Sequence, residues 1–363
     1  MPRILIAARL SRSVAVLAIL SSFALWAQLP PPPVPRMPLP PPGTEQPKDE
    51  TPPDDQPVKT FKVGVDVVQL FFNVKDKKGG LISDQTKDNF QLLEDGKPQT
   101  IKYFSANSDL PLTLGILIDT SLSQEAVLGA EQEVGGAFLK DVMREKDMAF
   151  VMSFDVRADL LQDFTNSNRE LRAALNKARI NTGGNAAASI PGIGSGPVPT
   201  ANRMKGTVLY DAVYLASHDE LSQQVGRKAM ILLTDGEDFG SQLKIRDAIE
   251  AAQKADSICY VLLVADRGFY AGSGFGYTGA GEMEKLTKET GGRMIEVGSK
   301  IEKLREAFDQ ISRELRSQYS VGYTPTNPNR DGGFRKVEIR STNGYKVQAR
   351  AGYYAPAGER SSN

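Results

Sequence analysis

The sequence predicts an α/β fold with a doubly wound, mainly parallel sheet and helices on both faces, joined to a small β-rich, Ig-like domain. Three observations predict it. Between residues 112 and 318, apolar strand-like runs alternate with amphipathic helical stretches, which is the pattern of repeated βαβ units. Several of these runs are continuously apolar, as strands buried on both faces are. The segments before and after this region hold short strand-like runs separated by turn residues, which is typical of antiparallel β-structure.

The alternating region supplies the strands and helices of the α/β domain, which we place at residues 109–318. We expect strands at 112–118, 148–154, 158–161, 228–234, 257–264 and 293–297. We expect helices at 125–143, 168–178, 207–221, 245–255, 282–290 and 300–318. The short spacing between the second and third strands predicts one antiparallel edge strand.

The two flanking segments are predicted to form one Ig-like unit around the inserted α/β domain. In residues 61–108, Glu94-Asp95-Gly96-Lys97 separates strand-like runs at 90–93 and 100–104, which is a strong hairpin signal. Residues 319–356 add further short strand-like runs. Since each flank alone is too small for a robust core, we expect the two to pack together.

The amino terminus is predicted to be a secretory signal peptide over residues 1–27. Arginines precede an apolar stretch at 14–26, and small residues close it. That stretch is too short for a comfortable membrane span, although an uncleaved anchor is the alternative. Residues 28–60, with 13 of the 22 prolines, predict a disordered linker, and 357–363 a disordered tail. We therefore expect a periplasmic or extracellular protein with no membrane span after cleavage.

Composition excludes several classes of function. Lys and Arg number 44 and Asp and Glu number 44, so no net charge attracts nucleic acid or an anionic membrane. Cys259 is the only cysteine and stands in an apolar run, which predicts a buried small side chain without a disulfide. His218 is the only histidine and lies in a helical stretch, which predicts a surface histidine and disfavours Ser-His-Asp catalysis.

Oxygen-bearing side chains follow two of the predicted strands and open one predicted helix. Asp119, Ser121 and Ser123 follow the strand at 112–118, Thr207 opens a helix, and Asp235 follows the strand at 228–234. In an open α/β sheet, ligands bind at the edge formed by the carboxyl ends of the strands. Carboxylates with neutral oxygens suit Mg²⁺, or Mn²⁺ or Ca²⁺, better than zinc or copper.

These five residues resemble the metal-ion-dependent adhesion site (MIDAS) of the von Willebrand factor type A domain. That family's pattern is D-x-S-x-S, then a threonine, then an aspartate after a later strand. The wider chain, over roughly residues 63–356, is similar to a secreted bacterial, acidobacterial-type family of von Willebrand factor A-related proteins. The resemblance implies a cation held by the five residues, with an acidic group of a partner protein completing its coordination. Leu122 stands where many members have a glycine, so the loop lacks a permissive residue.

The leading interpretation is a secreted or periplasmic protein-binding module of the adhesion type, without catalytic residues. An Mg²⁺-dependent phosphoryl-handling hydrolase built on Asp119 is the first alternative, but Ser121 stands where that chemistry needs a second acid. A metal-free envelope scaffold is the second alternative. We expect Glu237 and Asp238 to lie in a solvated turn. The long segment 181–205 leads directly to Thr207, and the long segment 267–281 follows a strand and should lie on the same face as the metal loops. The candidate partner contacts of segment 267–281 are Phe269, Tyr270, Phe275 and Tyr277, and a mobile loop without a partner is the alternative.

Overall fold

The computed structural model describes residues 67–106, 109–181, 206–264 and 277–358. The predicted signal peptide and the whole predicted linker lie outside these residues. So do segment 181–205, except for its first residue, and the contacts proposed for Phe269, Tyr270 and Phe275. Within them, no helix is long and apolar enough to cross a membrane. Ala357 and Gly358, which we assigned to the disordered tail, are placed, and Gly358 donates a backbone hydrogen bond of 2.7 Å to the Arg330 carbonyl.

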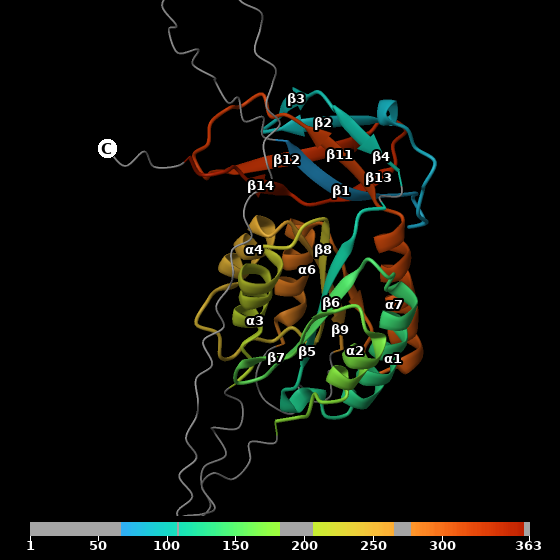
Figure 1. The fold of residues 1–363 in the computed structure, drawn as a ribbon, viewed down its shortest axis with the longest axis vertical. Helices are drawn as coiled ribbons and strands as arrows, with labels where there is room; N and C mark the ends of the chain where they lie inside the picture. Colours follow the sequence, from blue (N-terminus) through green and yellow to red (C-terminus); the bar gives the residue numbers. More distant parts are fainter. Residues whose placement is uncertain (1–66, 107–108, 182–205, 265–276, 359–363) are drawn as a thin grey trace, which may run out of the picture. The chain divides into compact units, whose positions relative to one another are not determined.

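A six-stranded sheet forms the middle layer of the α/β domain, with strand order β10-β9-β8-β5-β6-β7 (Figure 1). All neighbouring strands are parallel except β6 and β7, which are antiparallel. The prediction of a mainly parallel sheet with one antiparallel edge strand is confirmed. This architecture is compatible with the von Willebrand factor A-like fold that the resemblance implies. The strands are β5 (Leu112–Asp119), β6 (Met148–Phe154), β7 (Ala158–Thr165), β8 (Arg227–Thr234), β9 (Ser257–Leu263) and β10 (Met294–Glu296).

Helices cover both faces of this sheet (Figure 1). One face carries α1 (Leu128–Val142), α2 (Asn168–Leu175) and α7 (Ile301–Arg316). The other carries α3 (Leu209–Leu215), α4 (Ile245–Lys254) and α6 (Gly279–Thr290). Strand β5 serves both layers, because Ile116 and Ile118 pack with the first set of helices and Leu117 packs with the second. A strand with two buried faces must be apolar throughout, which explains the continuous apolar run in the sequence.

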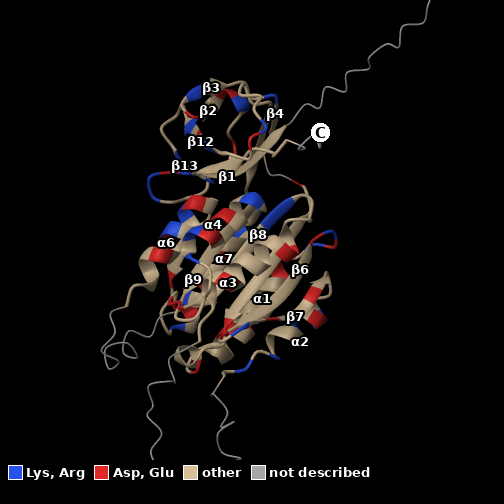
Figure 2. Ribbon diagram, turned by 90° about the vertical axis from the view of Figure 1, so that its left-hand side faces the viewer, with Lys and Arg blue, Asp and Glu red and all other residues tan. Residues whose placement is uncertain are grey.

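The helices are amphipathic, as their periodicity predicts. In α7, Leu304, Phe308, Ile311 and Leu315 are buried against the sheet. Figure 2 shows Lys and Arg interspersed with Asp and Glu along α4 and α6, with neither sign covering a whole helix.

Two helices begin two or three residues later than expected. The helix predicted at 207–221 begins at Leu209 and ends in a π-helical turn, η4 (Ala216–Leu221). Thr207, the expected first residue, lies outside this helix, because its carbonyl accepts hydrogen bonds from the loop that follows β8. The helix predicted from residue 125 begins at Leu128, since a separate 3-10 turn, η2 (Leu122–Gln124), precedes it.

The flanking segments form two four-stranded antiparallel sheets with a shared apolar core, which we call the sandwich (Figure 1). Their strand orders are β13-β1-β11-β4 and β14-β12-β2-β3, so strands from before and after the α/β domain pair with one another. The Ig-like classification stays a prediction. The strands are β1 (Val68–Lys75), β2 (Phe90–Glu94), β3 (Lys97–Gln99), β4 (Tyr103–Ser105), β11 (Tyr319–Tyr323), β12 (Phe334–Ser341), β13 (Lys346–Ala349) and β14 (Gly352–Tyr354), and a 3-10 turn, η1 (Lys87–Asn89), precedes β2.

The hairpin signal is confirmed at its turn but not in its second strand. Asp95 and Gly96 have φ values of 47° and 76°, and a type I′ turn needs such positive values at both central residues. Strand β3 ends at Gln99, whereas β4 pairs with β11 in the other sheet. The expectation of one hairpin strand at 100–104 is therefore wrong. Ile101, buried in the core of the sandwich, lies where the chain passes between the sheets.

A buried ion network joins the sandwich to α7. Glu314 Oε1 accepts hydrogen bonds from Lys75 Nζ of β1 at 2.7 Å and from Arg293 Nη1 at 2.9 Å. Its Oε2 accepts from Gln348 Nε2 of β13 at 3.2 Å, and its carbonyl accepts from Asn73 Nδ2 at 2.8 Å. Burial lowers the pKa of Lys75, and the nearby Glu314 charge opposes that shift. The Glu314 carboxylate is thus the counter-charge shared by Lys75 and Arg293 where the sandwich meets α7.

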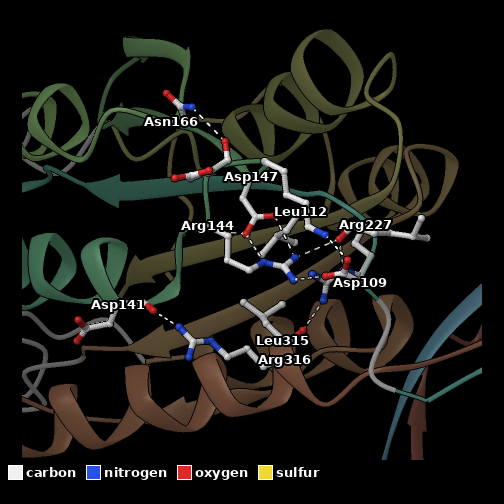
Figure 3. A network of polar contacts seen from close by, with 12 residues as sticks. Asp109, Leu112, Asp141, Arg144, Asp147, Asn166, Arg227, Leu315 and Arg316 are labelled. Atoms are coloured by element: carbon white, nitrogen blue, oxygen red, sulfur yellow. Dashed lines mark hydrogen bonds and ion pairs between the residues drawn. The ribbon is translucent and has the colours of Figure 1, made fainter.

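A second polar network holds the two places where the chain passes between the sandwich and the α/β domain (Figure 3). The Arg227 guanidinium donates to the carbonyl of Leu110, just before β5, and to that of Leu315, near the end of α7. Arg144 Nη2 also donates to the Leu110 carbonyl, at 3.2 Å, while its Nε donates to Asp147 at 2.9 Å. The entry and exit of the inserted domain are therefore fastened together.

Candidate metal centre

The candidate site lies where β5 and β8 end. These strands are adjacent and parallel, with Ile118 opposite Leu233, so the residues that follow them are neighbours. From β5 the chain passes to β6 on one side of the sheet and later to β8 on the other. Such a reversal of strand order leaves a crevice at the carboxyl edge of the sheet, where ligands bind in open α/β folds.

Asp119 is the last residue of β5 and is fully buried, with 0% of its surface exposed. One carboxylate oxygen, Oδ1, accepts a hydrogen bond from the Ser121 backbone N–H at 2.9 Å. The other, Oδ2, accepts from the Thr234 hydroxyl at 2.7 Å. Burial, together with the negative charge of Asp235, raises the pKa of Asp119 to about 7. An ionised carboxylate at this position therefore needs a compensating positive charge.

Asp235 brings the second carboxylate to the same place, and it is 1% exposed. Its Oδ2 accepts a short hydrogen bond from the Ser123 hydroxyl. The Ser121 and Ser123 hydroxyl oxygens lie 3.0 Å apart. Two serine hydroxyls and the Asp235 carboxylate thus form a continuous row of oxygens, and Ser121 also binds Asp119 through its backbone. Four of the five residues proposed from the sequence are linked by hydrogen bonds.

Thr207 reaches the site region through its backbone. The residue is buried, and its carbonyl accepts hydrogen bonds of 3.1 Å from the N–H groups of Phe239 and Gly240, in the loop after Asp235. The next N–H, of Val208, donates to the Asp155 carbonyl at the end of β6 at 2.7 Å. The structure therefore places Thr207 beside the Asp235 loop. Its hydroxyl makes no hydrogen bond with the other four residues in the described part of the chain.

The loop that lacks the family's glycine adopts ordinary backbone conformations. Ser121 has φ −66° and ψ 161°, and Leu122 opens the 3-10 turn η2. Among the described residues other than glycine, only Asp95 and Asp256 have positive φ. Leu122 therefore stands in the loop without left-handed strain. Its side chain is 40% exposed at the surface of the site.

Sequence reasoning missed two polar side chains that support the row of oxygens. Thr234 precedes Asp235 and donates to Asp119. Gln124 is fully buried, and its Nε2 donates to Asp235 Oδ2 at 3.0 Å, while its Oε1 has no donor among the described residues. Their only signal in the sequence is adjacency to the proposed ligands, because nothing local predicts that they turn inward.

Glu131 is the third group that sequence reasoning missed. It lies in the first turn of α1, is 1% exposed, and has no hydrogen-bond partner for either carboxylate oxygen in the described part of the chain. Burial, followed by the charges of Asp119 and Asp235, raises its pKa well above the ordinary value. A signal was present, since Glu131 falls on the stripe of buried residues with Leu128 and Phe138. A charge on the core-facing side of an amphipathic helix is unexpected and marks a special position.

The residues present fit a divalent cation. Two buried carboxylates lie beside two hydroxyls, and buried oxygens of Gln124 and Glu131 are among those that have no donor in the described part of the chain. Concentrated negative charge and unsatisfied acceptors are what a hard cation relieves. No group of three or more His, Cys, Asp or Glu side chains suited to a metal occurs in the residues that the structure describes. The hydroxyl groups would therefore have to act as ligands.

No family model and no curated protein matches this chain. Among solved structures, it is similar to the conserved hypothetical protein BatB from Bacteroides thetaiotaomicron, with 19% identity, 57% of this chain and 100% of that chain covered, and a TM-score of 0.41. It is also similar to proximal thread matrix protein 1 from the mussel byssus, at 14% identity, coverages of 61% and 51%, and a TM-score of 0.44. A third similar structure is the vWF domain of the type V pili tip protein Mfa5 from Porphyromonas gingivalis. Its sequence is 18% identical, the match covers 35% of this chain and 38% of that chain, and the TM-score is 0.25.

The loop after Asp235 is fixed by capping contacts. Glu237 is buried, and its Oε1 accepts from the N–H of Gly279 at 2.8 Å, at the start of α6. Asp238 Oδ1 accepts at 3.2 Å from a backbone N–H in the first turn of α3. The expectation of a solvated turn is therefore wrong, because both carboxylates satisfy helix N-termini. Tyr277, proposed as a partner contact, donates its hydroxyl to the Asp235 carbonyl at 2.8 Å.

The cysteine and the histidine lie apart from the site. Cys259 is fully buried in β9, and this burial raises the pKa of its thiol to about 12. His218 is exposed in η4, where its ring stacks on Tyr214 at a centroid distance of 5.2 Å and its Nδ1 contacts Asp219 at 2.7 Å. The predictions of a buried small cysteine and a surface histidine are confirmed.

Proposed function

We propose that this protein is an exported protein-binding module of the adhesion type, in which the α/β domain engages an acidic group of a partner through a divalent cation. The proposed ligands are Asp119, Ser121, Ser123, Thr207 and Asp235. The observation that supports the proposal most directly is the hydrogen bond between Ser123 and Asp235, 112 residues apart in sequence, beside the buried Asp119. Mg²⁺ is the preferred ion because it takes oxygen ligands and retains waters, and Mn²⁺ or Ca²⁺ are the alternatives.

The side chains divide the work of such a site. Asp119 and Asp235 supply negative charge, while the serine hydroxyls supply neutral oxygens. The Thr234 hydroxyl and the Ser121 N–H fix both oxygens of Asp119. A bound cation would keep residual positive charge, which supplies the attraction for a carboxylate of the partner. Because these groups are held by hydrogen bonds from rigid strand ends, binding requires little reorganisation.

Thermal unfolding of the full chain in EDTA and in excess Mg²⁺, Mn²⁺ or Ca²⁺ tests the proposal. At a cation concentration a hundredfold above the dissociation constant, mass action predicts about 2.7 kcal/mol of added stability. Ser123→Ala and Asp235→Asn should lose the cation-dependent rise in melting temperature. Asp309→Asn, an exposed aspartate on α7, is the matched control and should keep it. A parent protein that gains no stability from any of the three cations would contradict the proposal.

Capture of partner proteins from a cell-envelope extract, with and without EDTA, then tests the adhesive role. Capture that survives EDTA would favour the metal-free scaffold. The hydrolase alternative is tested with a phosphatase substrate and Mg²⁺. Turnover that is lost in Asp119→Asn would favour that alternative over the binding module.

A further inference from the structure

Two adjoining hollows open at the amino edge of the central sheet, the edge opposite to the candidate metal centre. Their volumes are about 520 Å³ and about 310 Å³. Both are lined by Val67 and Gln69, at the start of β1, by Asp256, between α4 and β9, and by Arg350. The larger volume lies in the range of small-molecule sites in proteins. We call the two together the basic hollow.

The charge of the lining is mostly positive. Asp256 is the one acidic residue among the described residues that line it. Among the described residues, Arg350 pairs with Asp256, Arg335 with Asp331 at 2.7 Å, and Lys254 with Glu250 at 2.7 Å. The basic lining residues are Lys228, Lys254, Arg330, Arg335 and Arg350.

Lys228 has no such partner within the described part of the chain. It is the second residue of β8, is 8% exposed, and lines the smaller hollow. No hydrogen bond or ion pair joins its ammonium group to another described residue. Burial lowers its pKa, an effect opposed by the charge of Asp256 and reinforced by that of Arg350. Its ammonium nitrogen does not belong to the fully enclosed polar atoms without a partner, so its three donors are left to solvent or to a ligand.

We propose that the basic hollow binds a small polar molecule bearing a phosphate or carboxylate group, with Lys228 and Arg350 contacting the anion. A guanidinium beside an ammonium is a common arrangement for such groups, because both donate charge-assisted hydrogen bonds. Gln69 lines both hollows and provides a polar side chain for the remainder of the ligand. This site uses none of the residues of the candidate metal centre, so either proposal can fail without the other.

Calorimetric titration of the full chain tests the site with inorganic phosphate, a hexose phosphate, a hexuronate and a neutral hexose. We expect binding of the anionic probes and not of the neutral hexose, and the ranking of phosphate against carboxylate identifies the anionic group. Lys228→Met preserves side-chain length and should weaken binding by about tenfold or more, because a charge-assisted contact is lost. Lys285→Met, at an exposed position of α6, is the matched control and should bind like the parent.

A second variant keeps the test decisive should Lys228→Met fold poorly. Val225 is 83% exposed and lines the smaller hollow, so Val225→Glu places a carboxylate there at little cost to folding. We expect this variant also to weaken binding of the anionic probes, and EDTA to change none of these results. Absence of binding by all three anions at millimolar concentrations would overturn the proposal. Equal affinities of the parent, Lys228→Met and Val225→Glu would also overturn it.

Discussion

Replacing Asp119 by asparagine removes a buried acid whose ionisation opposes folding. In the folded chain the pKa of Asp119 is about 7, against an ordinary value of 3.8. A difference of roughly three units, at about 1.36 kcal/mol each, corresponds to ~4 kcal/mol. The folded state holds this proton more tightly than the unfolded state. The contribution therefore favours folding at low pH, declines as the pH rises from about 4 to about 7, and stays low above that.

Urea unfolding in EDTA at several values between pH 4 and pH 8 measures the effect. Asparagine keeps the shape of the side chain and can still accept a hydrogen bond from the Ser121 N–H. The other titrating groups contribute equally to the free energy of unfolding of Asp119→Asn and of the parent, so their contributions drop out of the difference between the two proteins. It should shift in favour of the variant by up to ~4 kcal/mol across this range. Asp309→Asn should show a flat difference.

A flat difference for Asp119→Asn would refute the reasoning, because Asp119 would then ionise alike in both states. Added Mg²⁺ supplies the complementary result. A cation bound by the ionised carboxylates should restore the stability that the parent loses as the pH rises, and it should do little for Asp119→Asn. Restoration in both proteins would place the cation elsewhere.

Two further substitutions probe the framework. Glu314→Ala should cost about 3–5 kcal/mol, because it leaves Lys75 buried without a counter-charge, whereas Lys75→Met combined with Glu314→Leu should cost little. Urea unfolding compares them, and equal losses would contradict the ionic account. Gly115→Ala should cost about 1–3 kcal/mol, because its Cβ would lie 2.5 Å from Phe150 Cζ. Gly129→Ala in α1, with no atom within 4 Å of a new Cβ, is the control, and similar melting temperatures for the two alanine variants would contradict the packing argument.

Much of the fold followed from the sequence because its strands carry a strong pattern. Strand β6 (Met148–Phe154) begins and ends where it was expected, and β5 (Leu112–Asp119) extends one residue beyond the expected 112–118. Errors arose where distant backbone groups decide the local conformation. Thr207 leaves the helix because the loop after β8 binds its carbonyl, and β4 pairs with a strand more than 200 residues later. The local periodicity of a sequence does not indicate which distant backbone groups a residue will pair with.

The candidate site was predictable to the extent that topology alone determines it. Carboxyl ends of neighbouring parallel strands must meet, so Asp119 and Asp235 could be brought together from the order of the elements. The inward turn of Gln124 and the missing donors of Glu131 depend on side-chain packing. Both features could be identified only from the burial and hydrogen bonding of the folded chain. For Glu131 one indication was present in the sequence, which is that a glutamate stands among the apolar residues of one helix face.

The insertion of the α/β domain into the sandwich has a mechanical consequence. The chain enters and leaves that domain at two points fastened by Arg227. Tension applied between the start of β1 and the end of β14 is borne first by the hydrogen bonds of the sandwich sheets. Strand β5 and helix α7 bear no load until those sheets separate. A pull between the two ends of the sandwich therefore separates its sheets while the carboxyl edge of the central sheet, where the candidate metal centre lies, keeps its shape.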